Sequence, residues 1–136
     1  MIMDLQLGEL WVLRRDPQDL GLRERWWLTL YEWWDHHEAV RIGPAWPSPV
    51  VADASGPVWL GQINRVPPRG AGGATDLWLR LPAMTPDIRV WVNGTEVKGT
   101  GPAPEFNIGE LAYRPRGECE LQPPEGEVVL TVRLGR

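Results

Sequence analysis

The chain has 136 residues and a formal net charge of −4, from 14 basic and 18 acidic side chains. This length predicts a single domain over 1–136 with room for a sizeable core. The only cysteine, Cys119, excludes an internal disulfide. No basic run is longer than Arg14–Arg15, so the sequence does not indicate a nucleic-acid partner.

Membrane insertion is not indicated either, because no run of eighteen apolar residues occurs. The first ten residues, MIMDLQLGEL, lack the basic and apolar regions of a signal peptide, which predicts a cytoplasmic protein. Arginine outnumbers lysine 13 to 1 and proline reaches 14 residues, a composition typical of GC-rich genomes and of thermophiles. Nine tryptophans are the informative excess.

The segment 17–38 contains two tryptophan doublets, Trp26-Trp27 and Trp33-Trp34, and is compatible with a short helix. In a strand, one ring of each doublet would point outward, whereas in a helix the spacing of seven would place both doublets on one face. Either geometry leaves aromatic surface that something must cover.

The second half of the chain reads as β-strands. Apolar residues alternate over 77–81 (LWLRL), 88–92 (IRVWV) and 128–134 (VVLTVRL), and Asn93-Gly94 predicts a hairpin turn after the second of these runs. Clusters of proline and glycine at 67–73, 99–104 and 122–126 read as loops. Short strands separated by turns, without alternating helices, predict an all-β sandwich or jelly roll of two antiparallel sheets.

Five motifs in order resemble the N-terminal sugar-binding jelly-roll domain of family-two glycoside hydrolases, the β-galactosidase and β-glucuronidase type. They are ELWVLRRDPQDLGLRERWW (9–27), AVRIGPAW (39–46), GPVWLGQINRVP (56–67), LWLRLPAMTPDIRVWVNGTEV (77–97), and EFNIGEL (105–111) with EGEVVLTVRL (125–134). The resemblance covers nearly the whole chain and implies a galactose-binding-like β-sandwich, in which one member of Trp26-Trp27 belongs to the core.

The same resemblance does not imply catalysis, because the catalytic residues of that family lie in a separate barrel domain. In β-galactosidases the loop after the hairpin carries an acidic residue that touches the sugar. The corresponding stretch here, 97–102 (VKGTGP), contains no acidic residue. The resemblance therefore implies an accessory domain without an inherited sugar contact at this loop.

Carbohydrate binding would use indole rings, which stack on the apolar faces of sugars. The candidate rings are Trp33, Trp34, Trp46 and Trp78, with Asn64, Arg65, Asp76 and Asn107 as the polar groups that give specificity. Trp78 and Trp91 are expected beside each other on neighbouring strands. A packing role is favoured for Trp91, with Arg80 and Arg89 stacking on the two rings.

Other reactive side chains have simpler interpretations. Asp35-His36-His37-Glu38 reads as a solvated turn, because adjacent side chains do not easily converge on one metal ion or substrate atom. Asn93-Gly94-Thr95 is a glycosylation sequon that reads better as a turn. No residue pattern indicates a metal site, a cofactor or a nucleophile.

Two functions follow as hypotheses. The first is a non-catalytic carbohydrate-binding module. The second is a structural or interaction domain whose tryptophan-rich surface packs in a homo-oligomer or against another chain, such as a glycoside hydrolase catalytic domain. An enzyme is not supported, because no catalytic constellation is visible.

Overall fold

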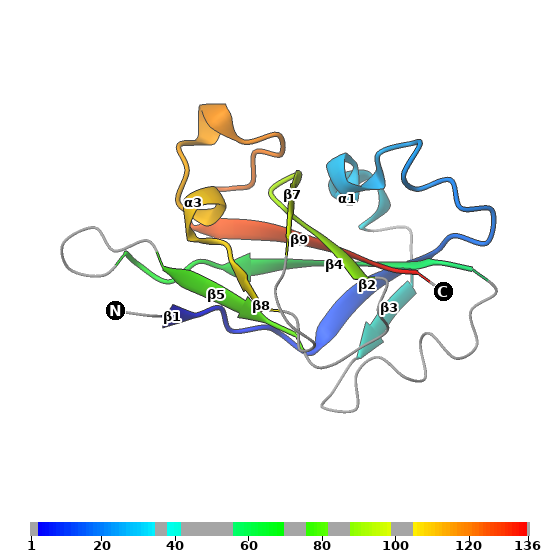
Figure 1. Cartoon of the computed structure of the whole chain (residues 1–136), viewed down its shortest axis with the longest axis horizontal. Coiled ribbons are helices and arrows are strands. Elements are labelled where there is room, and N and C mark those ends of the chain that lie inside the picture. The colour runs from blue at the N-terminus through cyan, green and yellow to red at the C-terminus, as the bar shows by residue number, and fades with distance from the viewer. Residues whose placement is uncertain are drawn as a thin grey trace.

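The computed structural model describes residues 3–34, 38–41, 56–69, 76–81, 88–98 and 105–135. It is an all-β sandwich with a few short helical turns, which confirms the predicted fold class (Figure 1). In the part of the chain described, no helix is long and apolar enough to cross a bilayer.

The larger sheet has six strands in the order β3-β2-β4-β9-β6-β7, and every neighbouring pair is antiparallel. Its strands are β2 (Leu10–Arg15), β3 (Glu38–Arg41), β4 (Val58–Arg65), β6 (Ile88–Val92), β7 (Thr95–Val97) and β9 (Glu127–Leu134). The alternating runs at 88–92 and 128–134 are therefore strands, as predicted.

The smaller sheet has the order β1-β5-β8, with β1 (Met3–Asp4), β5 (Leu77–Arg80) and β8 (Glu105–Asn107). β5 and β8 are antiparallel, but β1 runs parallel to β5, which corrects the expectation of two purely antiparallel sheets. After β1 the chain crosses to the larger sheet, where the buried Gln62 side chain donates to the carbonyl oxygens of Gly8 and Leu10, both at 2.8 Å. These bonds satisfy backbone groups that the crossing would otherwise leave unpaired.

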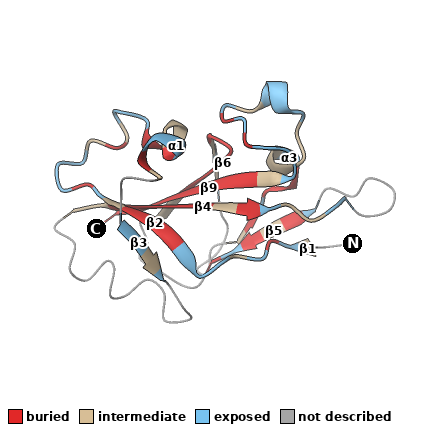
Figure 2. Cartoon of the chain, turned by 180° about the vertical axis from the view of Figure 1, so that it is seen from behind, coloured by how far each residue is buried: buried red, intermediate tan, exposed pale blue. Residues whose placement is uncertain are grey.

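The first hydrophobic core lies between the two sheets. Alternation places Val128, Leu130, Val132 and Leu134 of β9 on this inner face, as predicted, opposite residues such as Leu77 and Leu79 of β5. The buried residues of β4 and β9 are coloured red in Figure 2.

A second core covers the other face of the larger sheet. Segment 16–34 folds over this face and contains two short helical turns, η1 (Trp26–Leu28) and α1 (Leu30–Trp33), so the predicted short helix is confirmed. Buried members of this second core are Val12, Trp26, Leu30, Trp33, Trp59, Trp91, Leu121 and Val129. The central strands β4 and β9 of the larger sheet are therefore buried on both faces.

Glycine makes the close approach of this segment possible. A Cβ atom built on Gly61 of β4 would collide with Leu30 and lie 3.1 Å from the Trp33 ring. A Cβ at Gly21 would collide with the Trp59 indole. Side chains at these two positions would push the covering segment off the sheet.

The β6–β7 hairpin turns at Asn93-Gly94, where both residues have positive φ values of 49° and 84°. This is the backbone form that favours Asn-Gly in a two-residue hairpin loop. Asn93 is 3% exposed, and its Oδ1 accepts a 2.8 Å hydrogen bond from the Val129 backbone N–H. The sequon is thus a buried turn, as its sequence suggested.

Candidate functional site

Trp33 does not have the exposure that a ligand contact requires. Its side chain is 2% exposed in the second core, and its Nε1 donates a 3.2 Å hydrogen bond to the Trp26 carbonyl oxygen. Trp34 is half-buried at the end of α1, where it packs against the same core. Trp46 and the histidines of Asp35-His36-His37 lie outside the described residues.

Trp78 and Trp91 do not lie beside each other, because β5 and β6 belong to different sheets. Trp91 is 2% exposed, and its ring stacks on Trp27 with centroids 4.8 Å apart, so the packing role favoured for it is confirmed. Arg89 and Arg80 do lie over Trp91 and Trp78, with the guanidinium carbon 5.3 and 5.7 Å from the respective ring centroids.

Three predicted candidates do meet, on the outward face of the smaller sheet. Trp78 is half-buried there, and its β8 neighbour Asn107 donates a 3.1 Å hydrogen bond to Asp76. On the same face Arg80 bonds Asp4 and Glu105, at 2.9 and 2.7 Å. The polar groups of this face are thus engaged with one another, which leaves them less available to a ligand.

Asn64 and Arg65 lie at the end of β4, where Arg65 is exposed and Asn64 is 8% exposed. The Asn64 Nδ2 atom is buried and has no hydrogen-bond acceptor among the described residues. Arg65 pairs in register with Glu127, the first residue of β9. These two candidates therefore reach the end of the sandwich at which a hollow lies.

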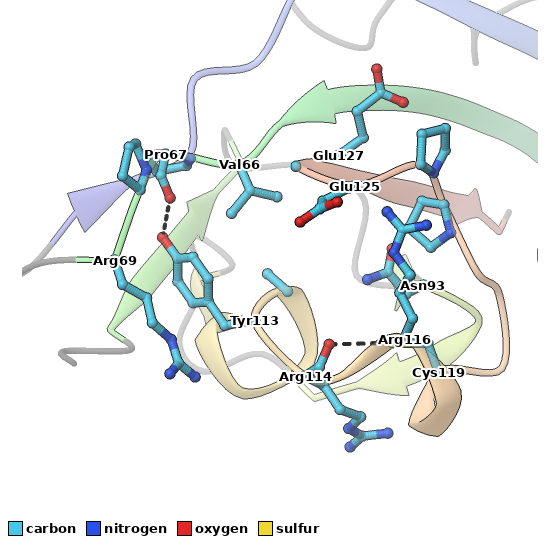
Figure 3. Close-up of a pocket in the computed structure, with 15 residues that line it drawn as sticks. Val66, Pro67, Arg69, Asn93, Tyr113, Arg114, Arg116, Cys119, Glu125 and Glu127 are labelled. Carbon is cyan, nitrogen blue, oxygen red and sulfur yellow. Dashed lines mark hydrogen bonds between the residues drawn. The ribbon is translucent and has the colours of Figure 1, made fainter.

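That hollow is a cavity of about 430 Å³, here called the Tyr113 pocket. Its walls come from three loop regions: the chain after β4, the chain from α3 (Gly109–Ala112) through η2 (Arg116–Glu118), and the loop that leads into β9. The hairpin residue Asn93 completes it (Figure 3). None of the seven predicted residues that lie within the described ranges lines this pocket.

An aromatic ring forms one wall of the pocket. The Tyr113 hydroxyl donates a 2.6 Å hydrogen bond to the Pro67 carbonyl oxygen, which ties the helical connection to the loop after β4. Burial raises the pKa of Tyr113, and the nearby Arg69 guanidinium partly opposes this effect. The hydroxyl is therefore neutral at physiological pH, and the ring remains an apolar surface with a fixed orientation.

Two opposite charges face the cavity from its rim. Figure 3 shows the side chains of Glu125 and Arg116 extending over the hollow, whereas those of Arg69 and Arg114 point away from it. Among the described residues, neither Glu125 nor Arg116 has a side-chain hydrogen bond or ion pair. An acceptor and a donor are thus both available to a ligand.

The inner wall contains a fixed amide and a thiol. Because Asn93 Oδ1 is held by Val129, its Nδ2 takes the donor position, with a long 3.4 Å contact to the Leu111 carbonyl oxygen. Cys119 also lines the pocket and is half-buried. The pocket can therefore bind a polar ligand through an amide, a carboxylate and a guanidinium beside an aromatic ring.

A smaller hollow of about 370 Å³ lies beside Asp16, but that carboxylate is occupied by internal bonds. Asp16 is 2% exposed and accepts from the Leu20 N–H at 2.7 Å, the Gly21 N–H at 2.9 Å and Trp59 Nε1 at 3.0 Å. It therefore fixes the covering segment to the sheet.

Within the described ranges, no group of three or more His, Cys, Asp or Glu side chains is arranged to hold a metal ion.

Comparison with known proteins identifies the fold. No protein-family model matches the sequence, and no curated protein matches it. A solved β-glucuronidase of Ruminococcus gnavus, in complex with uronic isofagomine, is 17% identical with a TM-score of 0.64 over 96% of this chain and 20% of that chain. A β-glucuronidase of an uncultured Clostridium species is 20% identical with a TM-score of 0.64, over 95% and 21%.

This chain thus spans about a fifth of the length of the β-glucuronidase chains it matches. At such identities the likeness establishes the shared β-sandwich fold.

The Tyr113 pocket was not predicted from the sequence. One of its walls, the QPPEG stretch at 122–126, was correctly predicted to be a loop. A tyrosine and ordinary charged residues in separate loops give no sequence pattern that marks a pocket.

Proposed function

We propose that this chain is a non-catalytic carbohydrate-binding domain and that its binding site is the Tyr113 pocket. One observation carries the proposal: the rim groups Glu125 and Arg116 face a cavity of about 430 Å³ beside an aromatic ring, with no partner among the described residues. Sugars present hydroxyl groups to such donors and acceptors and an apolar ring face to aromatic side chains.

The fold supports this proposal from a second direction. The structures it resembles are glycoside hydrolases, and the sequence motifs resemble the sugar-binding domain of family two. In this proposal the chain is an accessory domain of such an enzyme. The site differs from the one expected from the sequence, because Trp33 is core and Trp78 lies on a surface whose polar groups are already paired.

Glycan binding can be tested through Cys119, the only thiol in the chain and a residue of the pocket wall. A saturating glycan should slow alkylation of Cys119 by a maleimide, with an apparent Kd of ~1 µM to 1 mM, as expected for a shallow polar site. Glu125→Gln and Arg116→Gln should each raise the apparent Kd for this protection about tenfold, because each removes a charged hydrogen-bond partner.

The matched controls are Glu32→Gln and Arg23→Gln, exposed side chains on the covering segment away from the pocket. They should leave the protection unchanged. Alkylation rates that no glycan alters, across a panel of neutral, acidic and amino sugars, would refute the proposal.

The alternative function is a structural domain that packs against another chain. One observation supports it: the matched β-glucuronidases are about five times longer than this chain. In those enzymes the similar domain is therefore part of a longer chain. The tryptophans of segment 26–34 pack into the second core, so they do not provide the exposed surface that the sequence predicts for that role. This alternative would be favoured if sedimentation equilibrium showed a homo-oligomer and no glycan bound to the protein.

A further inference from the structure

We propose that the Tyr113 pocket selects sugars that carry an acetamido group, such as N-acetylglucosamine or N-acetylgalactosamine residues. This inference rests on the proposed function and narrows it to a substrate class. It comes from the combination of a fixed amide donor, two small apolar side chains and a carboxylate around one cavity.

The amide donor is Asn93. Its Oδ1 accepts from the Val129 N–H at 2.8 Å and its backbone N–H bonds the Val129 carbonyl oxygen at 2.9 Å, so the side chain cannot rotate to exchange its oxygen and nitrogen. Nδ2 carries two hydrogens, and its one acceptor among the described residues is the Leu111 carbonyl oxygen at 3.4 Å. The second hydrogen is available to a carbonyl oxygen in the cavity.

The apolar part of the wall comes from Val66 and Ala112. Both line the cavity, both are half-buried, and both pack against the first core, which holds them in place. A methyl group that contacts them is removed from water without desolvating a polar atom. An acetamido group presents such a methyl next to its carbonyl oxygen.

Glu125 provides the remaining complementarity. Its carboxylate faces the hollow in Figure 3 and can accept from the acetamido N–H or from a neighbouring hydroxyl. The Tyr113 ring offers a surface for the pyranose. A hexose with a hydroxyl in place of the acetamido group would leave the Val66 and Ala112 surface without its methyl contact.

The experiment measures Kd values for the methyl β-glycosides of N-acetylglucosamine, N-acetylgalactosamine, glucose and galactose, by calorimetry and by Cys119 protection. The acetamido sugars should bind at least about tenfold more tightly than the parent hexoses. A thioacetamido analogue, in which sulfur replaces the carbonyl oxygen, should bind several-fold more weakly, because sulfur is a poorer acceptor for the Asn93 amide.

A single substitution in the pocket tests the methyl contact. Ala112→Val adds bulk to the apolar wall and should reduce acetamido-sugar affinity about tenfold while changing parent-hexose affinity less than about threefold. Ala39→Val, on the exposed strand β3, is the matched control and should change neither.

The outcomes separate this inference from the function on which it rests. Equal affinities for the acetamido sugars and the parent hexoses would overturn the acetamido selection while leaving carbohydrate binding in place. A complete lack of binding by all four glycosides and by the wider glycan panel would overturn both.

Discussion

Replacing Trp33 with alanine should lower the free energy of unfolding by ~3 to 5 kcal/mol, the usual cost of truncating a buried aromatic side chain. The ring is 2% exposed, lies close to Gly61 of β4, and donates its Nε1–H to the Trp26 carbonyl oxygen. Truncation would leave a cavity in the second core and remove one of the donors to the Trp26 carbonyl oxygen, which would keep its hydrogen bonds from Thr29. Urea denaturation followed by far-ultraviolet circular dichroism measures the change.

Trp78→Ala is the matched control, because Trp78 is half-buried on the outward face of the smaller sheet. It should cost clearly less, about 1 kcal/mol, since its ring is already partly in water. If Trp33→Ala unfolded at the same urea concentration as the unmodified protein, Trp33 would not be a core residue, and the ligand contact predicted for it from the sequence would gain support.

Replacing Asp16 with asparagine should reduce the free energy of unfolding by ~2 to 4 kcal/mol, because buried N–H donors would lose their acceptors. One carboxylate oxygen accepts from the Leu20 N–H and the other from both the Gly21 N–H and Trp59 Nε1. In either orientation, the asparagine amide would direct its NH₂ group toward at least one of these donors. Urea denaturation again gives the magnitude.

Asp4→Asn provides the comparison for Asp16. Asp4 has a 51% exposed side chain and a single ion pair, with Arg80, so its replacement should cost less than ~1 kcal/mol. Equal losses for Asp16→Asn and Asp4→Asn would contradict the view that Asp16 fixes the covering segment to the sheet.

Most of the sandwich could be predicted from the sequence, because strand periodicity and turn chemistry are local. The alternation at 77–81, 88–92 and 128–134 and the Asn93-Gly94 turn each determine their own backbone form. The parallel pairing of β1 with β5 was not predictable in this way. It joins Met3 to Leu77, and two residues of strand carry no pattern that identifies a partner so distant.

The tryptophan doublets illustrate a different limit. The sequence predicts that the aromatic side chains of 26–34 must be covered by another surface. It does not predict that this surface is the outer face of the larger sheet of the same chain. The deciding residue is Gly61, whose lack of a side chain makes room for Leu30 and Trp33 on β4. A glycine in a strand predicts a close approach but does not say which segment approaches.

The Tyr113 pocket was beyond sequence reasoning for a geometric reason. Tyr113, Arg116 and Glu125 follow no spacing that places them on one helix face or one strand face. They meet because the hairpin at Asn93 and the ends of β4 and β9 bring three loops together. The predicted candidates Asn64 and Arg65 lie at the same end of the sandwich as this pocket but do not line it.

The indole rings of the second core have a spectroscopic consequence. Trp27 and Trp91 stack at 4.8 Å, Trp91 and Trp59 at 5.2 Å, and Trp59 and Trp26 lie 5.7 Å apart with planes inclined by 59°. Chromophores this close share their excited states, so the group should produce an exciton couplet in circular dichroism. Detachment of segment 16–34 with the sandwich intact would remove the contributions of Trp26 and Trp27 and leave that of the Trp59–Trp91 pair, because Trp59 and Trp91 lie on β4 and β6. Complete unfolding would remove all of them, so the size of the loss would distinguish partial opening from complete unfolding.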